Sequence, residues 1–216
     1  IYLFIRILYS NYKMVNNKTR KRLRRPQKTN KVYSITDYES NDGMLTTVWG
    51  PGMWHALHTI SFNYPVNPTT DDKHNYMKFI LNLKYVLPCG KCRKNFRKNL
   101  KHLPLTISQM QSRDTFSKYI YHLHELINTM LGKKSGLSYD DVRERYEHFR
   151  ARCAQPIADM LKKSVCKTRK SGKKIENGCT EPLYGEKSKC ILKIVPNDEK
   201  CDTFQIDEKC IKKKLL

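Results

Sequence analysis

The sequence has no apolar run long enough to cross a lipid bilayer. Its amino-terminal stretch, IYLFIRILYS, is apolar for eight residues and is already interrupted by Arg6, whereas a membrane-spanning helix needs roughly 20 residues. No small-residue cleavage site of the kind that ends a secretory signal peptide follows this stretch. We therefore expect neither a membrane anchor nor a secretory signal.

Acidic residues are also scarce: 20 Asp and Glu stand against 42 Lys and Arg, which gives a formal charge of +22. This excess predicts attraction to nucleic acid or anionic lipid, although solvated lysines explain it equally well. A compact basic run, Lys18–Arg25, is followed by Pro26 and a polar stretch that reaches Gly43. We expect residues 1–43 to form a disordered arm. The run is a candidate for nucleic-acid contact, nuclear targeting or packaging, or it serves only as a solubilising tail.

Strand patterns are lacking too, and the segment from Trp49 to about Arg152 has helical periodicity throughout. Prolines and glycines divide this segment: Pro51 stands near the first turn of one helix, Pro88 separates two others, and Gly132 ends a fourth. The pattern predicts five short helices, which is typical of an all-α bundle.

Two of these helices have recognisable starts. Thr70 is a candidate cap followed by acidic residues, and Ser138 is a candidate cap with Asp141 three residues on. The helix after Thr70 carries an apolar stripe that we expect to face the core: Tyr76, Phe79, Ile80 and Leu83.

The last third of the chain, residues 153–216, has few large apolar residues and is broken by glycine and proline. We expect it to depend on cross-links or on docking to the bundle, because it cannot build a core alone. It holds six of the eight cysteines: Cys153, Cys166, Cys179, Cys190, Cys201 and Cys210. No two of them form a CxxC motif, and the sequence does not select their pairing.

The other two cysteines form the chain's single CxxC motif, Cys89-Gly90-Lys91-Cys92. A structural zinc site needs a second pair of ligands, which His102 or the tail cysteines would have to supply by folding back. A thioredoxin-like motif needs a strand and a βαβ pattern, which this chain lacks. A third interpretation is a redox-active disulfide at the start of a helix.

The chemistry of a helix start favours this third interpretation. The unpaired N–H groups and the helix dipole stabilise a thiolate there, and Lys91, Arg93 and Lys94 add positive charge. A static disulfide between Cys89 and Cys92 would close almost no loop and would contribute little stability. We therefore expect a reactive sulfur pair.

Three blocks in order, WGPGMWHALHTISFNYP (49–65), LPCGKC (87–92) and HELINTMLGK (124–133), resemble the signature blocks of the Erv/ALR flavin-linked sulfhydryl oxidases. The opening Trp-Gly-Pro and the lack of extra core cysteines are most similar to the versions carried by large DNA viruses. The resemblance implies a four-helix bundle with a short fifth helix over residues 44–152. It also implies an FAD-dependent thiol oxidase that works as a homodimer.

The resemblance further implies roles for individual residues. Cys89 and Cys92 would be the catalytic disulfide, with Cys89 accepting electrons from a protein dithiol, such as a thioredoxin-like carrier, and Cys92 next to the flavin. The flavin would then reduce O2 to hydrogen peroxide. The residues that match cofactor contacts of the family are Gly50, Trp54, His58, Tyr64, His124, Asn128, Leu131, Lys133 and Tyr146.

The chain departs from the family pattern in two places. The usual His-Asn pair reads His124-Glu125, and the positions of a second disulfide found in many cellular relatives are Tyr121 and Ser138. Members of the family often carry a shuttle cysteine pair on a flexible arm. The tail cysteines are therefore candidates for structural disulfides, for a shuttle, or for a zinc site.

We expect one of two locations for the protein and keep one alternative function open. The absence of a secretory signal favours the host cytoplasm, in a viral factory, or the virion, where a local thiol oxidant makes sense because the cytosol keeps thiols reduced. The rival is a basic, nucleic-acid-binding helical virion protein whose cysteines hold a metal.

Overall fold

The computed structural model describes residues 35–151, 179, 181–199 and 205–212. Within these residues the secondary structure is helical and contains no strand, and an isolated bridge joins Ala151 to Pro182. The α-helices are α1 (Ile35–Tyr38), α2 (Thr46–Phe62), α3 (Thr70–Val86), α4 (Gly90–His102), α5 (Arg113–Met130) and α6 (Tyr139–Glu147). Two 3₁₀ turns, η1 (Ile107–Met110) and η2 (Glu208–Cys210), complete the set. The predicted all-α class and the five helices α2–α6 are confirmed.

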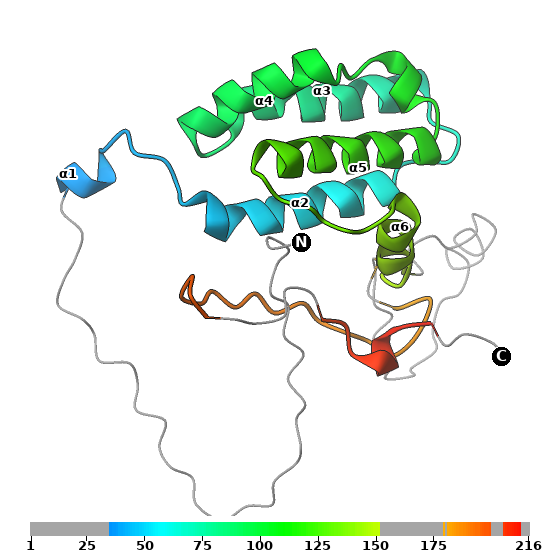
Figure 1. Ribbon diagram of the computed structural model, residues 1–216. Coiled ribbons are helices and arrows are strands. Elements are labelled where there is room, and N and C mark those ends of the chain that lie inside the picture. The colour runs from blue at the N-terminus through cyan, green and yellow to red at the C-terminus, as the bar shows by residue number, and fades with distance from the viewer. Residues whose placement is uncertain (1–34, 152–178, 180, 200–204, 213–216) are drawn as a thin grey trace, which may run out of the picture.

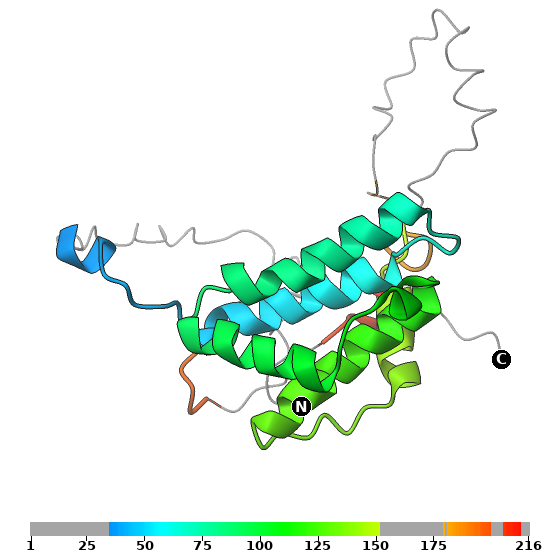
Figure 2. The same cartoon turned by 90° about the horizontal axis from the view of Figure 1, so that it is seen from above.

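Helices α2 to α5 form a four-helix bundle, and α6 packs across one end of it (Figure 1). One layer contains α3 and α4, the other contains α2 and α5, and α6 contacts both α2 and α5; Figure 2 shows the same bundle from above. The interior is closed by large apolar side chains without exposed surface: Tyr64, Ile80, Met110, Phe116, Ile120 and Leu123. The hydrophobic effect of this core holds the scaffold on which the sulfur pair is mounted.

Local hydrogen bonds fix the first turns of the helices. The predicted cap at Ser138 is confirmed, because its hydroxyl accepts the Asp141 N–H at 3.2 Å and the Asp141 carboxylate accepts the Ser138 N–H at 2.8 Å. The cap of α3 is Thr69, one residue before the predicted Thr70, and its hydroxyl accepts the Asp72 N–H. The reason is the three-residue spacing of a capping box, which Thr69 and Asp72 satisfy.

Helix α2 begins earlier than the sequence pattern predicts, so that Pro51 lies inside the helix and not in its first turn. Tertiary contacts fix this early start. The Met44 N–H donates to the Pro88 carbonyl at 2.8 Å, and the Trp49 Nε1–H donates to the Met44 carbonyl at 3.0 Å. The segment before α2 is thereby tied to the turn before α4.

The predicted apolar stripe of α3 is only partly buried. Ile80 and Leu83 lie in the core, whereas Phe79 is 43% exposed. Within the described residues α3 packs on α4 and η1, so a side chain on its outer side has nothing to cover it. The Phe79 prediction is therefore wrong, and the three other stripe residues face the core as expected.

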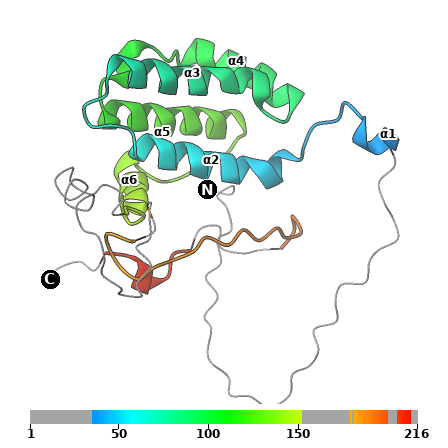
Figure 3. The same cartoon turned by 180° about the vertical axis from the view of Figure 1, so that it is seen from behind.

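One portion of the described tail lies beside the α6 end of the bundle, and another runs below α2 (Figure 3). The Leu183 N–H donates to the Arg150 carbonyl at 2.8 Å, and the Arg150 guanidinium donates to the Phe62 carbonyl at 2.6 Å. Two tail segments cross closely at Gly185, whose φ is +67°. A Cβ added at this position would lie 2.6 Å from the Cys210 backbone, so the crossing requires glycine. Docking on the bundle thus supplies the support that we expect this region to need.

The division into an arm (1–43), a bundle (44–152) and a tail (153–216) stays a prediction. The basic run Lys18–Arg25 and the tail residues Cys153, Cys166 and Cys201 lie outside the described residues. None of the described helices has the length and hydropathy of a membrane span.

Candidate redox and cofactor site

The sulfur pair lies at the start of α4, as the sequence predicts. Cys89 is the N-cap of this helix, and its sulfur accepts the Cys92 N–H at 3.2 Å. Both residues are free thiols, and Cys92 packs against the hydrophobic core. Cys89 is therefore the outer sulfur and Cys92 the inner one.

The two thiols differ in acidity because their surroundings differ. Hydrogen bonds from the Cys92 thiol and then from the Cys92 backbone N–H lower the pKa of Cys89. Burial, followed by the hydrogen bond to Cys89, raises the pKa of Cys92. When the pair is reduced, the thiolate therefore resides on Cys89. This is the helix-start polarisation that the sequence indicates, assigned to one sulfur.

The first residue of α2 and the segment before it each supply one contact to the sulfur pair that no local sequence pattern predicts. The hydroxyl oxygen of Thr46 lies 3.5 Å from Cys92 Sγ. Gly43 lies close to the turn between α3 and α4, residues 87–89, which we call the redox turn. A Cβ added at Gly43 would lie 3.1 Å from Cys89 Cα. Since Thr46 and Cys92 are 46 positions apart, no local pattern signals the contact.

A second cluster, which we call the imidazole cluster, consists of aromatic and imidazole rings from α2, α5 and α6, with Trp54, His58, His124 and Tyr146 at its centre. Trp54 and His124 are stacked with ring centroids 3.9 Å apart and an angle of 8° between the ring planes. His58 Nε2 lies 3.0 Å from His124 Nδ1, and the His58 ring stacks on Tyr146 at 5.3 Å. The structure thus brings together four of the predicted cofactor residues from three helices.

The two central histidines are neutral imidazoles at physiological pH. Burial lowers the pKa of His124 to about 3. Burial, and then the charges that His124 and His55 would carry, lower the pKa of His58 well below its ordinary value. A neutral imidazole offers one donor and one acceptor, so the hydrogen bond between the two rings joins a donor nitrogen to an acceptor nitrogen.

His55 is a further member of this cluster that the sequence analysis did not single out. Its Nδ1 lies 3.3 Å from the Tyr146 hydroxyl, and its ring meets Phe149 edge-on at 6.1 Å. The available signal was its position three residues before His58 on the same helix, which places the two side chains as neighbours.

Tyr64 lies in the main hydrophobic core. Its hydroxyl donates to the Met110 carbonyl at 2.9 Å, and its ring packs edge-on against Tyr76 at 4.7 Å and tilted against Phe116 at 5.0 Å. Its described ring contacts are thus with core residues and not with the imidazole cluster. A cofactor contact for Tyr64 stays a prediction.

The remaining predicted cofactor residues lie near the ends of α2 and α5. The Asn128 side-chain amide donates to the Glu125 carboxylate at 2.9 Å, and the Asn128 backbone carbonyl accepts the N–H groups of Leu131 and Lys133. Glu125, the departure from the family's His-Asn pair, thus orients the neighbouring amide. Leu131 is 53% exposed, and Gly50 is buried in α2.

The residues of the imidazole cluster fit the flavin dinucleotide that the resemblance implies. Flat aromatic faces at Trp54 and Tyr146 suit stacking with heterocyclic rings, and the neutral imidazoles suit hydrogen bonds to uncharged ring atoms. Lys133 provides a positive charge of the kind that a pyrophosphate needs.

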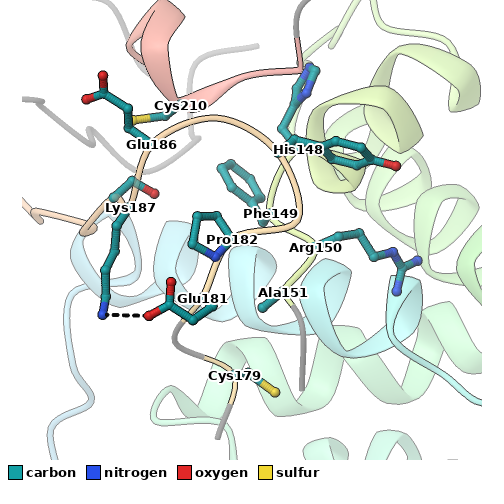
Figure 4. Close-up of a pocket in the computed structure, with 12 residues that line it drawn as sticks. His148, Phe149, Arg150, Ala151, Cys179, Glu181, Pro182, Glu186, Lys187 and Cys210 are labelled. Carbon is teal, nitrogen blue, oxygen red and sulfur yellow. Dashed lines mark hydrogen bonds and ion pairs between the residues drawn. The ribbon is translucent and has the colours of Figure 1, made fainter. Parts of the chain in front are cut away.

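Two of the tail cysteines, Cys179 and Cys210, lie beside the residues that follow α6. A cavity of about 160 Å³ between α6 and the tail is lined by His148, Phe149 and Arg150 on one side and by Cys179, Tyr184 and Cys210 on the other (Figure 4). Cys179 is disulfide-bonded, whereas Cys190 and Cys210 are free thiols. Burial, then Asp207 and Glu186, raise the pKa of Cys210. Whether the tail cysteines act as a shuttle stays a prediction.

Among the described residues, no three His, Cys, Asp or Glu side chains are grouped so that they would hold a metal ion.

Comparison with known proteins gives a consistent match over the bundle. The family model of the Erv1 / Alr family matches residues 51–147. A probable FAD-linked sulfhydryl oxidase of Acanthamoeba polyphaga mimivirus is 39% identical over 99 residues, which are 46% of this chain and 68% of the relative. A putative FAD-linked sulfhydryl oxidase of Invertebrate iridescent virus 6 is 31% identical over 90 residues, 40% of this chain and 81% of the relative. The crystal structure of the yeast Erv1 core aligns with a TM-score of 0.44 at 20% identity, covering 56% of this chain and 96% of that one.

Proposed function

Because the chain belongs to the Erv1 / Alr family, we propose that it is an FAD-linked thiol oxidase that forms disulfides in protein substrates. The observation that carries this proposal is the pair at the start of α4, where Cys89 has a lowered pKa and Cys92 packs inward. Two viral relatives whose names describe a probable and a putative FAD-linked sulfhydryl oxidase support it, with 39% and 31% identity over 99 and 90 residues.

The sulfur chemistry follows from the positions of the two cysteines. A substrate thiolate attacks Sγ of Cys89 in the oxidised pair, which forms a mixed disulfide and releases Cys92 as a thiolate. The second substrate thiolate then attacks the substrate sulfur of the mixed disulfide, which releases Cys89 and completes the substrate disulfide. Two electrons have moved from the substrate to the chain, and the hydrogen bonds at the helix start stabilise the thiolate on Cys89.

When bound, FAD would supply the two-electron redox chemistry that links the reduced pair to O2, so that the sum would be one dithiol and one O2 converted to one disulfide and one hydrogen peroxide. The chain's part is to hold the cofactor. Trp54 and Tyr146 would stack on its rings, His58 and His124 would hydrogen-bond to it, and Lys133 would face its phosphates. Gly50, Tyr64, Asn128 and Leu131 complete the proposed binding set.

The biological setting is a proposal of the same kind. Two of the relatives come from large DNA viruses, which supports a role in the host cytoplasm, in a viral factory, or in the virion. The substrates would be protein dithiols, including a thioredoxin-like carrier, and the active form would be a homodimer.

The experiment uses the purified full chain. We expect a yellow protein with a flavin absorbance spectrum, oxygen uptake with dithiothreitol, and one hydrogen peroxide formed for each O2 consumed. A Cys190→Ser variant is the matched control, because Cys190 is an exposed thiol of the tail, and it should oxidise dithiothreitol at the wild-type rate.

Two results would contradict the proposal. One is a protein that stays colourless after incubation with FAD; the other is a flavoprotein that consumes no oxygen with dithiothreitol. Bound zinc and salt-dependent DNA affinity in a colourless protein would instead support the nucleic-acid-binding alternative.

A further inference from the structure

The helix that begins at the sulfur pair is strongly and uniformly basic. Helix α4 carries six Lys and Arg side chains in 13 residues and no Asp or Glu. Its buried side, Phe96 and Asn99, faces the bundle, so the cations lie on the opposite, exposed side. We call this side the α4 basic face: Lys91, Lys94, Arg97, Lys98 and Lys101, all of them exposed.

Nothing within the described residues neutralises this face. The ion pairs of the described residues join Lys118 to Asp114, Arg143 to Asp140, Arg150 to Glu147 and Lys187 to Glu181. None of these pairs involves α4. Like charges three and four residues apart on a helix repel one another. Cations in the first turn also oppose the helix dipole. The face therefore gains from an acidic partner outside the described part of the chain.

An exposed aromatic and aliphatic pair adjoins the face. Tyr85 is 60% exposed and Val86 67% exposed, at the end of α3 just before the redox turn. Lys84 Nζ lies 5.0 Å from the centroid of the Tyr85 ring, and the Arg97 guanidinium carbon lies 5.6 Å from it. These cation–π contacts hold the Tyr85 ring between α3 and α4 without burying it.

We propose that the α4 basic face, with Tyr85 and Val86 beside it, is the docking surface for a protein substrate whose reactive cysteines are flanked by acidic residues. The inference rests on the proposed thiol oxidase function and names the class of substrate that it serves. A face of 13 helical residues is about 20 Å long, which accommodates a short acidic segment whose cysteines reach Cys89 at its start.

The position of the face favours a protein over a nucleic acid as the occupant. It begins at Cys89, the sulfur that exchanges with substrate thiols. The adjoining Tyr85 and Val86 give an apolar anchor of the kind that protein interfaces use. Opposite charges steer diffusional encounter and raise the association rate, an effect that salt weakens.

The test compares two synthetic dithiol peptides that differ only in Glu or Gln at the positions flanking the cysteines. We expect kcat/KM for the Glu peptide to exceed that for the Gln peptide by about tenfold at low salt, and the ratio to approach one at high salt. Lys98→Glu combined with Lys101→Glu should remove most of this preference, because both residues are exposed and lie away from the sulfur pair.

The matched control combines Lys189→Glu with Lys193→Glu. It changes the net charge equally, on exposed residues of the tail at the opposite side of the bundle from α4. It should retain the preference, and all three proteins should oxidise dithiothreitol equally. Equal rates with both peptides, or equal losses in both double variants, would overturn the proposal. A DNA oligonucleotide that binds to this face while both peptides react equally would overturn it as well. No turnover of dithiothreitol by the wild type would instead refute the proposed function.

A separate contact concerns Thr46 in the first turn of α2. Its hydroxyl oxygen lies 3.5 Å from Cys92 Sγ. The hydrogen bond from the Met44 N–H to the Pro88 carbonyl fixes the start of α2 against the redox turn. In the proposed reaction Cys92 is released as a thiolate at a partly buried position, where a hydrogen-bond donor stabilises the charge.

We infer that Thr46 is a positioning residue whose hydroxyl donates a hydrogen bond to the Cys92 thiolate. The test measures alkylation of Cys92 by iodoacetamide against pH in a Cys89→Ser background, which needs no turnover. Thr46→Val should slow alkylation at neutral pH by about threefold to tenfold, since one charge-assisted hydrogen bond is lost, and Thr46→Ser should restore it.

Two results would contradict a role for the Thr46 hydroxyl. One is alkylation of the Thr46→Val variant at the reference rate over the whole pH range. The other is a Thr46→Ser variant as slow as Thr46→Val, which would assign the effect to packing of the methyl group. Circular dichroism of each variant checks that the bundle is folded.

Discussion

The two parts of the site solve opposite physical problems. At the start of α4, Cys89 is partly exposed, and hydrogen bonds lower its pKa and so favour its charged form. Between α2, α5 and α6, His58 and His124 are buried, and burial lowers their pKa values and so favours their neutral form. One part is built to hold charge near solvent and the other to exclude it.

The difference shows how one small bundle can carry both steps of a thiol oxidation. Exchange with an outside thiol requires an accessible sulfur and a stabilised thiolate. Binding a heterocyclic cofactor requires flat faces and neutral donors shielded from water. Each requirement is met by a different physical device, so substitutions should affect the two parts separately.

The largest effect is expected for Cys92→Ser. This change removes the sulfur that would form the proposed disulfide with Cys89 but leaves the imidazole cluster intact. Turnover of dithiothreitol should fall at least about a hundredfold, while the flavin absorbance is retained. Oxygen uptake and the visible spectrum measure both quantities on one sample. Oxidation at the normal rate would mean that the assignment of roles to the two sulfurs is wrong.

The next effect is acid sensitivity that arises in the imidazole cluster. Below about pH 6.5 the unfolded chain protonates His124, whereas the folded chain does so only near pH 3. As the pH is lowered through this range, the free energy of unfolding should therefore decrease, by about 1.4 kcal/mol per pH unit from this residue. Denaturant titrations between pH 7.5 and 5 measure the slope. His124→Gln should make the slope of the unfolding free energy against pH shallower. The exposed control His74→Gln should leave this slope unchanged. The reverse result would show that the buried imidazole does not cause the slope.

A smaller effect should appear at the sulfur pair itself. The Cys92 thiol is the first cause of the lowered pKa of Cys89. In Cys92→Ala the midpoint of Cys89 alkylation should move to higher pH, and in Cys92→Ser, which keeps a hydroxyl donor, it should move less. Mass spectrometry of the alkylated Cys89 peptide gives the profile. Identical midpoints in the three proteins would assign the shift to the helix start alone.

The smallest effect is expected for Lys118→Ala on α5. Lys118 pairs with Asp114 at 2.8 Å, but both side chains are about half exposed. The free energy of unfolding should change by less than about 0.5 kcal/mol, with no change in turnover or flavin content. A larger loss in thermal or chemical denaturation would show that this surface pair supports one of the two parts of the site.

Much of the fold could be read from local patterns. The cap at Ser138 and the helix start at Cys89 depend on residues within three or four positions of one another, and both occur where the sequence places them. The start of α2 and the exposure of Phe79 were misjudged, because both depend on what packs against the helix.

The sulfur pair and the helical class were thus determined by the sequence itself, since helix caps, dipoles and side-chain periodicity act over one or two turns. The contact of Thr46 with Cys92 and the meeting of Trp54, His58, His124 and Tyr146 were decided only by the tertiary structure. These residues lie on separate helices, and only the packing of the bundle sets which of their side chains touch.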